Sequence, residues 1–169
     1  MTRHRIYPED HLATAGRAEL VAWLARERAD LLAQLAGLDE RILCEAPITG
    51  HWTAKDLLAH VAYWDTFFTE MVIIALAGRA AEVPDVTLDE RNAIIYAERR
   101  AWPLRLALAT LDNARAGFLA AFDQAPMETL DTEHTFGWGR ASLRRIVKWR
   151  GYHDSDHAAQ IEAWRQQRQ

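Results

Sequence analysis

Two histidines near the C-terminus, His153 and His157, stand four residues apart in a segment that favours a helix. Residues i and i+4 share one face of a helix, with Cβ atoms about 5–6 Å apart. Two imidazoles at this spacing can bind one divalent ion at about 2.0–2.1 Å if a neighbouring helix supplies a third nitrogen. The pair therefore predicts part of a metal site, and a third ligand has to come from elsewhere in the chain.

The third candidate is His60, which fills the gap between Leu57 and Trp64 in the apolar stripe of an earlier helical segment. In the last segment, the stripe of apolar residues continues through Arg150, His153 and His157. All three histidines thus occupy positions that the helical period assigns to the core. Ordinary hydrogen-bonded core histidines are the competing interpretation. A buried polar ring without a partner costs on the order of 1–3 kcal/mol, however, and one shared ion such as Zn²⁺ or Ni²⁺ would satisfy all three.

A zinc protease is a weaker interpretation of the same histidine pair. Such an enzyme carries H-E-x-x-H on a helix, with the glutamate acting as the base. This chain has His153-Asp154-Ser155-Asp156-His157, and the shorter aspartate reaches a metal-bound water less easily. We predict that Asp154 and Asp156 are solvated or orient an imidazole N–H.

The elements that must position these residues are all expected to be helices. Apolar residues at three- and four-residue steps, together with cap signals and breakers, predict the segments. The pattern contains no useful stretch of the two-residue strand period, so it predicts an all-α four-helix bundle with an extra or kinked helix around Pro103. We expect one domain over residues 1–169, with 1–13 a flexible or loosely packed N-terminal segment. The predicted helices are about 14–36, 53–77 capped by Thr53 with Asp56, 87–101 with a Thr87–Glu90 capping box, 102–124, and 141–165.

Composition limits the functional classes. The net charge is −4 with charges of both signs interspersed, which disfavours nucleic acid as a partner. The single cysteine, Cys44, allows no internal disulfide and fits a reducing cytoplasm. The N-terminus lacks the apolar core of a signal peptide, and the apolar run "MVIIALAG" is too short for a bilayer. We expect a soluble cytoplasmic protein that does not enter a membrane.

A few further side chains are candidates for binding a small-molecule substrate. Arg150 lies in line with the inward stripe, one turn before His153, and could clamp a carboxylate. Asn92 and Tyr96 share one helical face and are expected to offer hydrogen bonds to a pocket. Cys44 is interpreted as structural. Four tryptophans are assigned to the bundle core, namely Trp52, Trp64, Trp149 and Trp164.

Two sequence motifs resemble a known family. "HWTAKDLLAHVAYWD" resembles the second-helix signature of the DinB-like (YfiT-like) superfamily of four-helix bundles, and "YHDSDHAAQI" resembles its closing H-x-x-x-H motif. The resemblance assigns the metal ligands to His60, His153 and His157. The segment "DERNAIIYAERRAWP" is further similar to the ClbS/DfsB-type branch. That branch includes hydrolases thought to work without this triad, so its mechanism does not transfer simply.

The resemblance implies a divalent metal in the bundle, often in a homodimer, and activities that include thiol-dependent S-transferases and isomerases. The leading hypothesis is therefore a metal-dependent enzyme, either a transferase using a low-molecular-weight thiol or a hydrolase, acting on small reactive molecules. The sequence identifies no catalytic base and does not choose between these reactions. The alternative is a non-catalytic stress or resistance protein that sequesters a small molecule or a metal.

Overall fold

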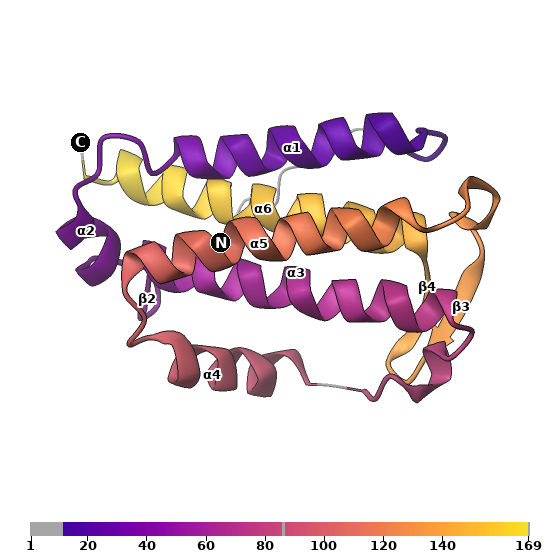
Figure 1. The fold of residues 1–169 in the computed structure, drawn as a ribbon. Coiled ribbons are helices and arrows are strands. Elements are labelled where there is room, and N and C mark those ends of the chain that lie inside the picture. Colours follow the sequence, from indigo (N-terminus) through magenta and orange to yellow (C-terminus); the bar gives the residue numbers. More distant parts are fainter. Residues whose placement is uncertain (1–11, 86, 169) are drawn as a thin grey trace.

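Four long helices dominate the computed structural model, which describes residues 12–85 and 87–168. They run side by side, with α3 packed mainly against α5 and α1 mainly against α6 (Figure 1). The predicted all-α four-helix bundle is confirmed. The bundle helices are α1 (Arg17–Ala33), α3 (Ala54–Leu76), α5 (Leu104–Asp123) and α6 (Leu143–Gln166).

Shorter elements close the ends of the bundle. Helix α4 (Leu88–Arg99) lies along the outside of α3, and α2 (Glu40–Glu45) follows α1 (Figure 1). Two antiparallel hairpins were not predicted, because strands of two to four residues are too short to display a two-residue period. Their strands are β1 (Pro47–Thr49) with β2 (Trp52–Thr53), and β3 (Glu133–Phe136) with β4 (Gly139–Ser142); the 3₁₀ turns are η1 (Ala80–Glu82) and η2 (Met127–Thr129).

The helix starts confirm one predicted cap and correct another. Asp56 N donates to Thr53 Oγ1 at 3.3 Å, so Thr53 caps α3 as predicted. Thr53 N also donates to Asp56 Oδ2 at 3.0 Å, which completes a capping box that the sequence analysis did not predict. The predicted box of α4 is wrong, because Thr87 makes no side-chain cap bond. Thr87 and Glu90 are exposed, and water can solvate both groups there. Pro103 is the N-cap of α5, so the break predicted there separates two helices.

The N-terminal segment was expected to pack loosely over residues 1–13. Residues 1–11 lie outside the described residues. Leu12 is 3% exposed and belongs to the core, and its carbonyl accepts a hydrogen bond from Arg144 Nη1 at 3.0 Å. The last part of this segment is therefore packed.

The apolar core is divided into two clusters by a buried layer of charge. One cluster includes Leu24 and Phe118 and lies toward the β3–β4 hairpin, whereas the other includes Leu58 and Leu111 and lies toward α2. Each long helix contributes one or two buried charged side chains between the apolar residues that it gives to the two clusters. We call this layer the ion cluster; its members are Arg28, Asp65, Arg115, Arg150 and Asp154.

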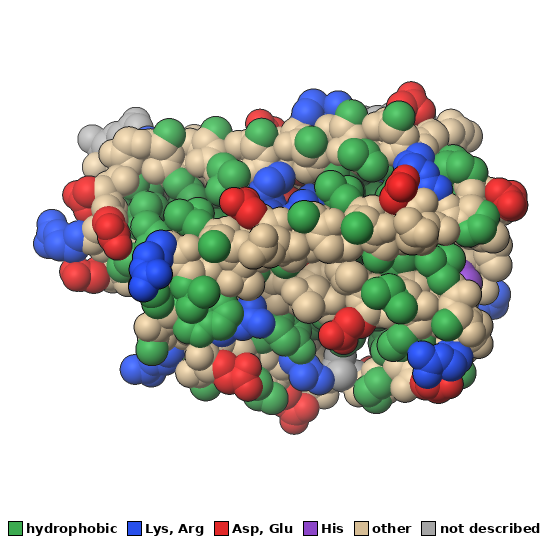
Figure 2. Space-filling view, in the orientation of Figure 1, with side chains coloured by type: hydrophobic (Ala, Val, Ile, Leu, Met, Phe, Trp, Pro, Cys, Tyr) green, Lys and Arg blue, Asp and Glu red, His purple; other side chains and the backbone are tan. Residues whose placement is uncertain are grey.

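Helix α3 is long and apolar enough, by length and composition alone, to cross a membrane. However, 56% of its apolar window is buried inside the bundle, as in the core helices of soluble proteins. It also carries Asp65, whose carboxylate is fully buried among arginines. The visible face in Figure 2 has acidic and basic side chains interspersed among apolar ones. These features are consistent with a soluble protein.

Candidate metal centre

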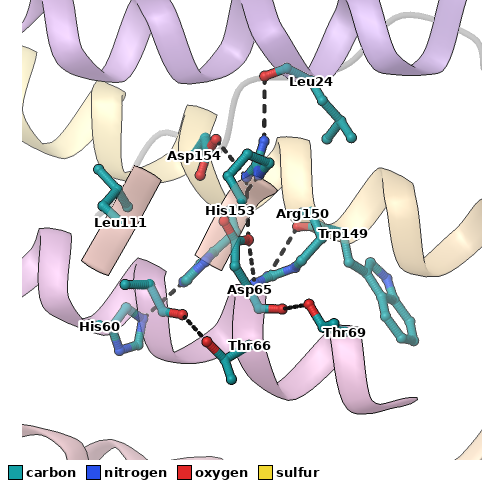
Figure 3. Close-up of polar contacts among 12 residues, drawn as sticks. Leu24, His60, Asp65, Thr66, Thr69, Leu111, Trp149, Arg150, His153 and Asp154 are labelled. Carbon is teal, nitrogen blue, oxygen red and sulfur yellow. Dashed lines mark hydrogen bonds and ion pairs between the residues drawn. The ribbon is translucent and has the colours of Figure 1, made fainter. Parts of the chain in front are cut away.

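The three predicted histidines meet inside the bundle, near its α2 end. His60 comes from α3, whereas His153 and His157 stand one turn apart on α6. His153 Nε2 lies 2.8 Å from His60 Nε2 and 3.0 Å from His157 Nε2. One ligand nitrogen from each residue lies within 4.8 Å of the others. The predicted convergence of the three histidines, here called the histidine cluster, is confirmed; Figure 3 labels two of them, His60 and His153.

The environment keeps these imidazoles neutral. Burial is the largest cause that lowers the pKa of His60 to about 2, and His157 and the positive charge of Arg150 act in the same direction. Burial also lowers the pKa of His153 well below its ordinary value. The pKa of His157 is lowered by burial despite its hydrogen bond to Gln160. Neutral imidazole is the form in which histidine binds a metal.

Protons alone cannot satisfy the histidine cluster. His157 Nδ1 donates to Gln160 Oε1 at 2.9 Å, which leaves His157 Nε2 as a bare lone pair. His153 Nε2 then faces two nitrogens, and a single proton on it cannot make a well-aligned hydrogen bond to both. A divalent ion would accept all three lone pairs at once. Ligand nitrogens of a tetrahedral zinc site are about 3.3 Å apart, so the observed spacings need only a small outward adjustment.

The three histidines differ in whether a neighbouring group forms a hydrogen bond with the ring nitrogen Nδ1. Gln160 supports His157 through Nδ1, as metal-bound histidines commonly require. The Nδ1 atoms of His60 and His153 are buried and have no hydrogen-bond partner among the described residues. Gln160 is therefore the group that fixes the ring orientation and tautomer of one ligand, and the sequence interpretation did not identify it.

A cavity of about 440 Å³ opens beside the histidine cluster. Its walls come from the β1–β2 hairpin, α3, α4 and α6, and its volume suits a small molecule. His60 and His157 belong to the wall, so an ion held there would face the cavity. The lining residues are Thr49, His51, Trp52, Leu57, His60, Asp89, Asn92, Ala93, Tyr96, His157 and Gln160.

The predicted substrate-binding residues separate into two groups. Asn92 and Tyr96 line the cavity from α4. Arg150 is not among the lining residues; it is 3% exposed, its Nη1 lies 3.6 Å from Asp65 Oδ1, and its guanidinium covers the ring of Phe68 at 4.4 Å. The structure therefore places Arg150 in the ion cluster, where burial lowers its pKa to about 10.

Asp154 also corrects the sequence interpretation. It is neither solvated nor bonded to an imidazole in the described contacts: it is fully buried and accepts from Arg28 Nε at 3.0 Å and Arg115 Nη2 at 2.9 Å. The two arginines come from α1 and α5, and a sequence pattern does not reveal that pairing. Asp156 is half-buried.

Several cavity residues were missed or assigned elsewhere. Trp52 was assigned to the core, but it lines the cavity, and its ring meets His60 edge-on with centroids 5.3 Å apart. His51 packs on Tyr96 with centroids 4.3 Å apart. Two features of the sequence could have identified these cavity residues: the His51-Trp52 pair just before the cap of α3, and Gln160 three residues after His157.

Burial raises the pKa of the Cys44 thiol, which fits its structural interpretation.

Comparison with known proteins identifies the family and the fold. The DinB superfamily matches residues 23–161. A solved protein from Streptococcus pneumoniae superposes with a TM-score of 0.75 at 14% identity, covering 90% of this chain and 91% of that one. A protein from Clostridium difficile 630 has a TM-score of 0.75 at 14% identity, covering 96% and 98%.

A third solved structure is a mutant of a mycothiol-dependent maleylpyruvate isomerase. It has a TM-score of 0.74 at 18% identity, and the match covers 89% of this chain and 62% of the isomerase. These identities establish a shared fold. No curated protein matches the chain.

Proposed function

This chain belongs to the DinB superfamily, and on that premise we propose that it is a metal-dependent enzyme acting on small reactive molecules. The observation that carries the proposal is the histidine cluster at the wall of the cavity. Three neutral nitrogens converge there without a proton arrangement that satisfies them, and a substrate-sized space adjoins two of them. Zn²⁺ and Ni²⁺ suit such an all-imidazole site.

Each residue has a defined task in this proposal. His60, His153 and His157 would hold the ion, and Gln160 orients His157 through its Nδ1–H. A divalent ion with three protein ligands lowers the pKa of a bound water or thiol and polarises an electrophile. Trp52 and Tyr96 cover one side of the cavity with aromatic surface.

The proposed reaction is transfer to or from a low-molecular-weight thiol, with hydrolysis as the second possibility. A thiol is supported by the solved neighbour that is a mycothiol-dependent isomerase. Hydrolysis is supported by the open side of the histidine cluster toward the cavity. The proposed setting is the cytoplasm, where such thiols stay reduced.

The first test combines metal content with turnover. The purified protein is expected to bind one equivalent of Zn²⁺ or Ni²⁺ and to consume small electrophiles in the presence of mycothiol or bacillithiol. His60→Ala should lose both the metal and the turnover, whereas His134→Ala, in strand β3, should retain both. Stoichiometric metal without turnover of any electrophile would favour the alternative of a sequestering stress protein. Wild-type protein that cannot be loaded with metal would refute the proposal.

A homodimer is also proposed. Six large apolar side chains are exposed on the described surface, mostly on α3, α4 and α5, and a partner copy would cover part of them. They are Ile73, Leu76, Leu88, Ile94, Leu106 and Met127. Sedimentation at micromolar concentration should report about twice the monomer mass of 19.3 kDa. A monomer would reject the dimer and leave the metal site unaffected.

A further inference from the structure

Two carboxamide side chains line the cavity, and in each the oxygen is already engaged. Trp64 Nε1 donates to Asn92 Oδ1 at 3.2 Å. An indole N–H can only donate, so the oxygen of Asn92 must be the atom that faces Trp64. The amino group of Asn92 is therefore the end that remains for the cavity.

The oxygen of Gln160, on helix α6, is engaged in the same way as the oxygen of Asn92. Its Oε1 accepts from His157 Nδ1 at 2.9 Å. A His157 that uses Nε2 toward the histidine cluster carries its proton on Nδ1, so Gln160 must present oxygen to it. Neither amino group, Asn92 Nδ2 or Gln160 Nε2, has a hydrogen-bond partner within residues 12–85 and 87–168. The cavity thus offers two neutral N–H donors beside the wall formed by His60 and His157.

The rest of the lining shows what kind of molecule these donors suit. Trp52 and Tyr96 form an aromatic wall with ring centroids 5.1 Å apart, and His51 extends it. The planes of the Trp52 and Tyr96 rings are tilted by 50°, so a flat, conjugated group can stack on one ring and meet the other at its edge. The lining that residues 12–85 and 87–168 provide includes no lysine and no arginine, so these residues would recognise an oxygen through amide hydrogens instead of a cationic side chain. Asp89 adds a carboxylate at the α4 side of the cavity.

We infer that this cavity binds a planar conjugated carbonyl compound. Its carbonyl oxygen accepts hydrogen bonds from Asn92 Nδ2 and Gln160 Nε2, and its conjugated part lies against Trp52 and Tyr96. Two donors on one oxygen polarise the carbonyl, and they are already oriented by Trp64 and His157 before the ligand arrives. This inference rests on the proposed function, because it names the electrophile class of that same site.

The test uses para-(dimethylamino)cinnamaldehyde, a flat aldehyde whose visible absorption moves to longer wavelength when its oxygen is hydrogen-bonded or polarised. Zinc-loaded and metal-free wild type are titrated with it, and both are expected to give a red-shifted band. Asn92→Asp and Gln160→Glu keep the oxygen that Trp64 or His157 needs and replace the amino donor with a carboxylate oxygen. Each should weaken binding about tenfold or more.

Matched controls carry the same chemical changes outside the cavity. Asn113→Asp on α5 and Gln166→Glu at the end of α6 are exposed, and both should bind the aldehyde like wild type. The corresponding alcohol, para-(dimethylamino)cinnamyl alcohol, tests the inference without any substitution. It has nearly the same shape but no carbonyl, and wild type should bind it at least tenfold more weakly.

The outcomes separate this inference from the proposed function. Equal affinity for aldehyde and alcohol, or unchanged aldehyde affinity in both Asn92→Asp and Gln160→Glu, overturns the inference even if the protein binds zinc. A wild type that binds no zinc overturns the proposed function. The inference survives that result if the metal-free protein still shifts the aldehyde band and the two cavity variants lose the shift.

Discussion

Two polar clusters lie at neighbouring levels of the bundle interior, and they differ in whether their acceptor atoms have donors; Figure 3 labels Asp65 and Asp154 of the ion cluster and His60 and His153 of the histidine cluster. In the ion cluster, Asp65 and Asp154 accept hydrogen bonds from Arg28 and Arg115 at 2.8–3.3 Å. Burial would raise the pKa of Asp65, but the surrounding arginines outweigh burial and lower it. The two carboxylates of this cluster are thus paired without a ligand, although Arg150 Nε and Nη1 make no hydrogen bond among the described residues.

The histidine cluster lacks such complementarity. Its three nitrogens are all potential acceptors at short spacing, and no carboxylate or carbonyl among the described residues pairs with His60 Nδ1 or His153 Nδ1. Arg150 connects the two levels. The ion cluster has three guanidinium groups and two carboxylates, and the positive charge of Arg150 helps to lower the pKa of His60 and His153, which keeps these imidazoles neutral. Buried carboxylates that are paired with arginines stabilise the fold, whereas unpaired imidazole nitrogens beside a cavity are suited to binding a metal ion.

The largest expected effect comes from breaking the ion cluster. Asp65→Ala leaves Arg28, Arg115 and Arg150 with a single buried carboxylate and should lower the free energy of unfolding by about 3–5 kcal/mol. Urea denaturation followed by circular dichroism measures this change. Asp112→Ala, an exposed position on α5, should change it by less than about 0.5 kcal/mol. A loss below 1 kcal/mol in Asp65→Ala would show that the network contributes little.

The histidine cluster should respond to metal instead. In metal-free protein, His153→Ala is expected to change stability by less than about 1 kcal/mol, because the variant removes a polar ring that has an unsatisfied nitrogen. Zinc at one hundred times its Kd should stabilise wild type by about 2.7 kcal/mol and leave His153→Ala nearly unchanged. Thermal unfolding with and without zinc gives both values. Equal stabilisation of the two proteins would exclude His153 as a ligand.

The smallest expected effect is the change in unfolding free energy per pH unit in mild acid, which should come from the histidine cluster and not from the ion cluster. The pKa of His60 is about 2 in the folded protein and 6.5 unfolded, so only the unfolded chain takes up its proton between these values. The stabilising contribution is complete above pH 6.5 and is lost as pH falls, by about 1.4 kcal/mol per pH unit for such an imidazole. The lowered pKa of Asp65 keeps its carboxylate charged between pH 7 and pH 5. The same unfolding free energy at pH 7 and pH 5 in metal-free protein would contradict this.

Helical periodicity by itself determined most of the secondary structure and the membership of the histidine cluster. The stripes through Leu57 and Trp64, and through Ile146 and Ile161, point one face of each helix inward, and they placed the three histidines on those faces. The cap at Thr53 and the break at Pro103 were also readable, because their signals are local.

Only the tertiary structure decided which inward residues stand at the same level. Periodicity assigns a side chain to a face, but the axial offset between helices is determined by loops and packing. Arg28 and Arg115 are 87 residues apart in the sequence and lie on different helices. Both contact Asp154 only because the axial offset of their helices brings them to its level. For the same reason Arg150 faces Asp65 instead of the cavity, and Asn92 and Gln160, on separate helices, line one cavity.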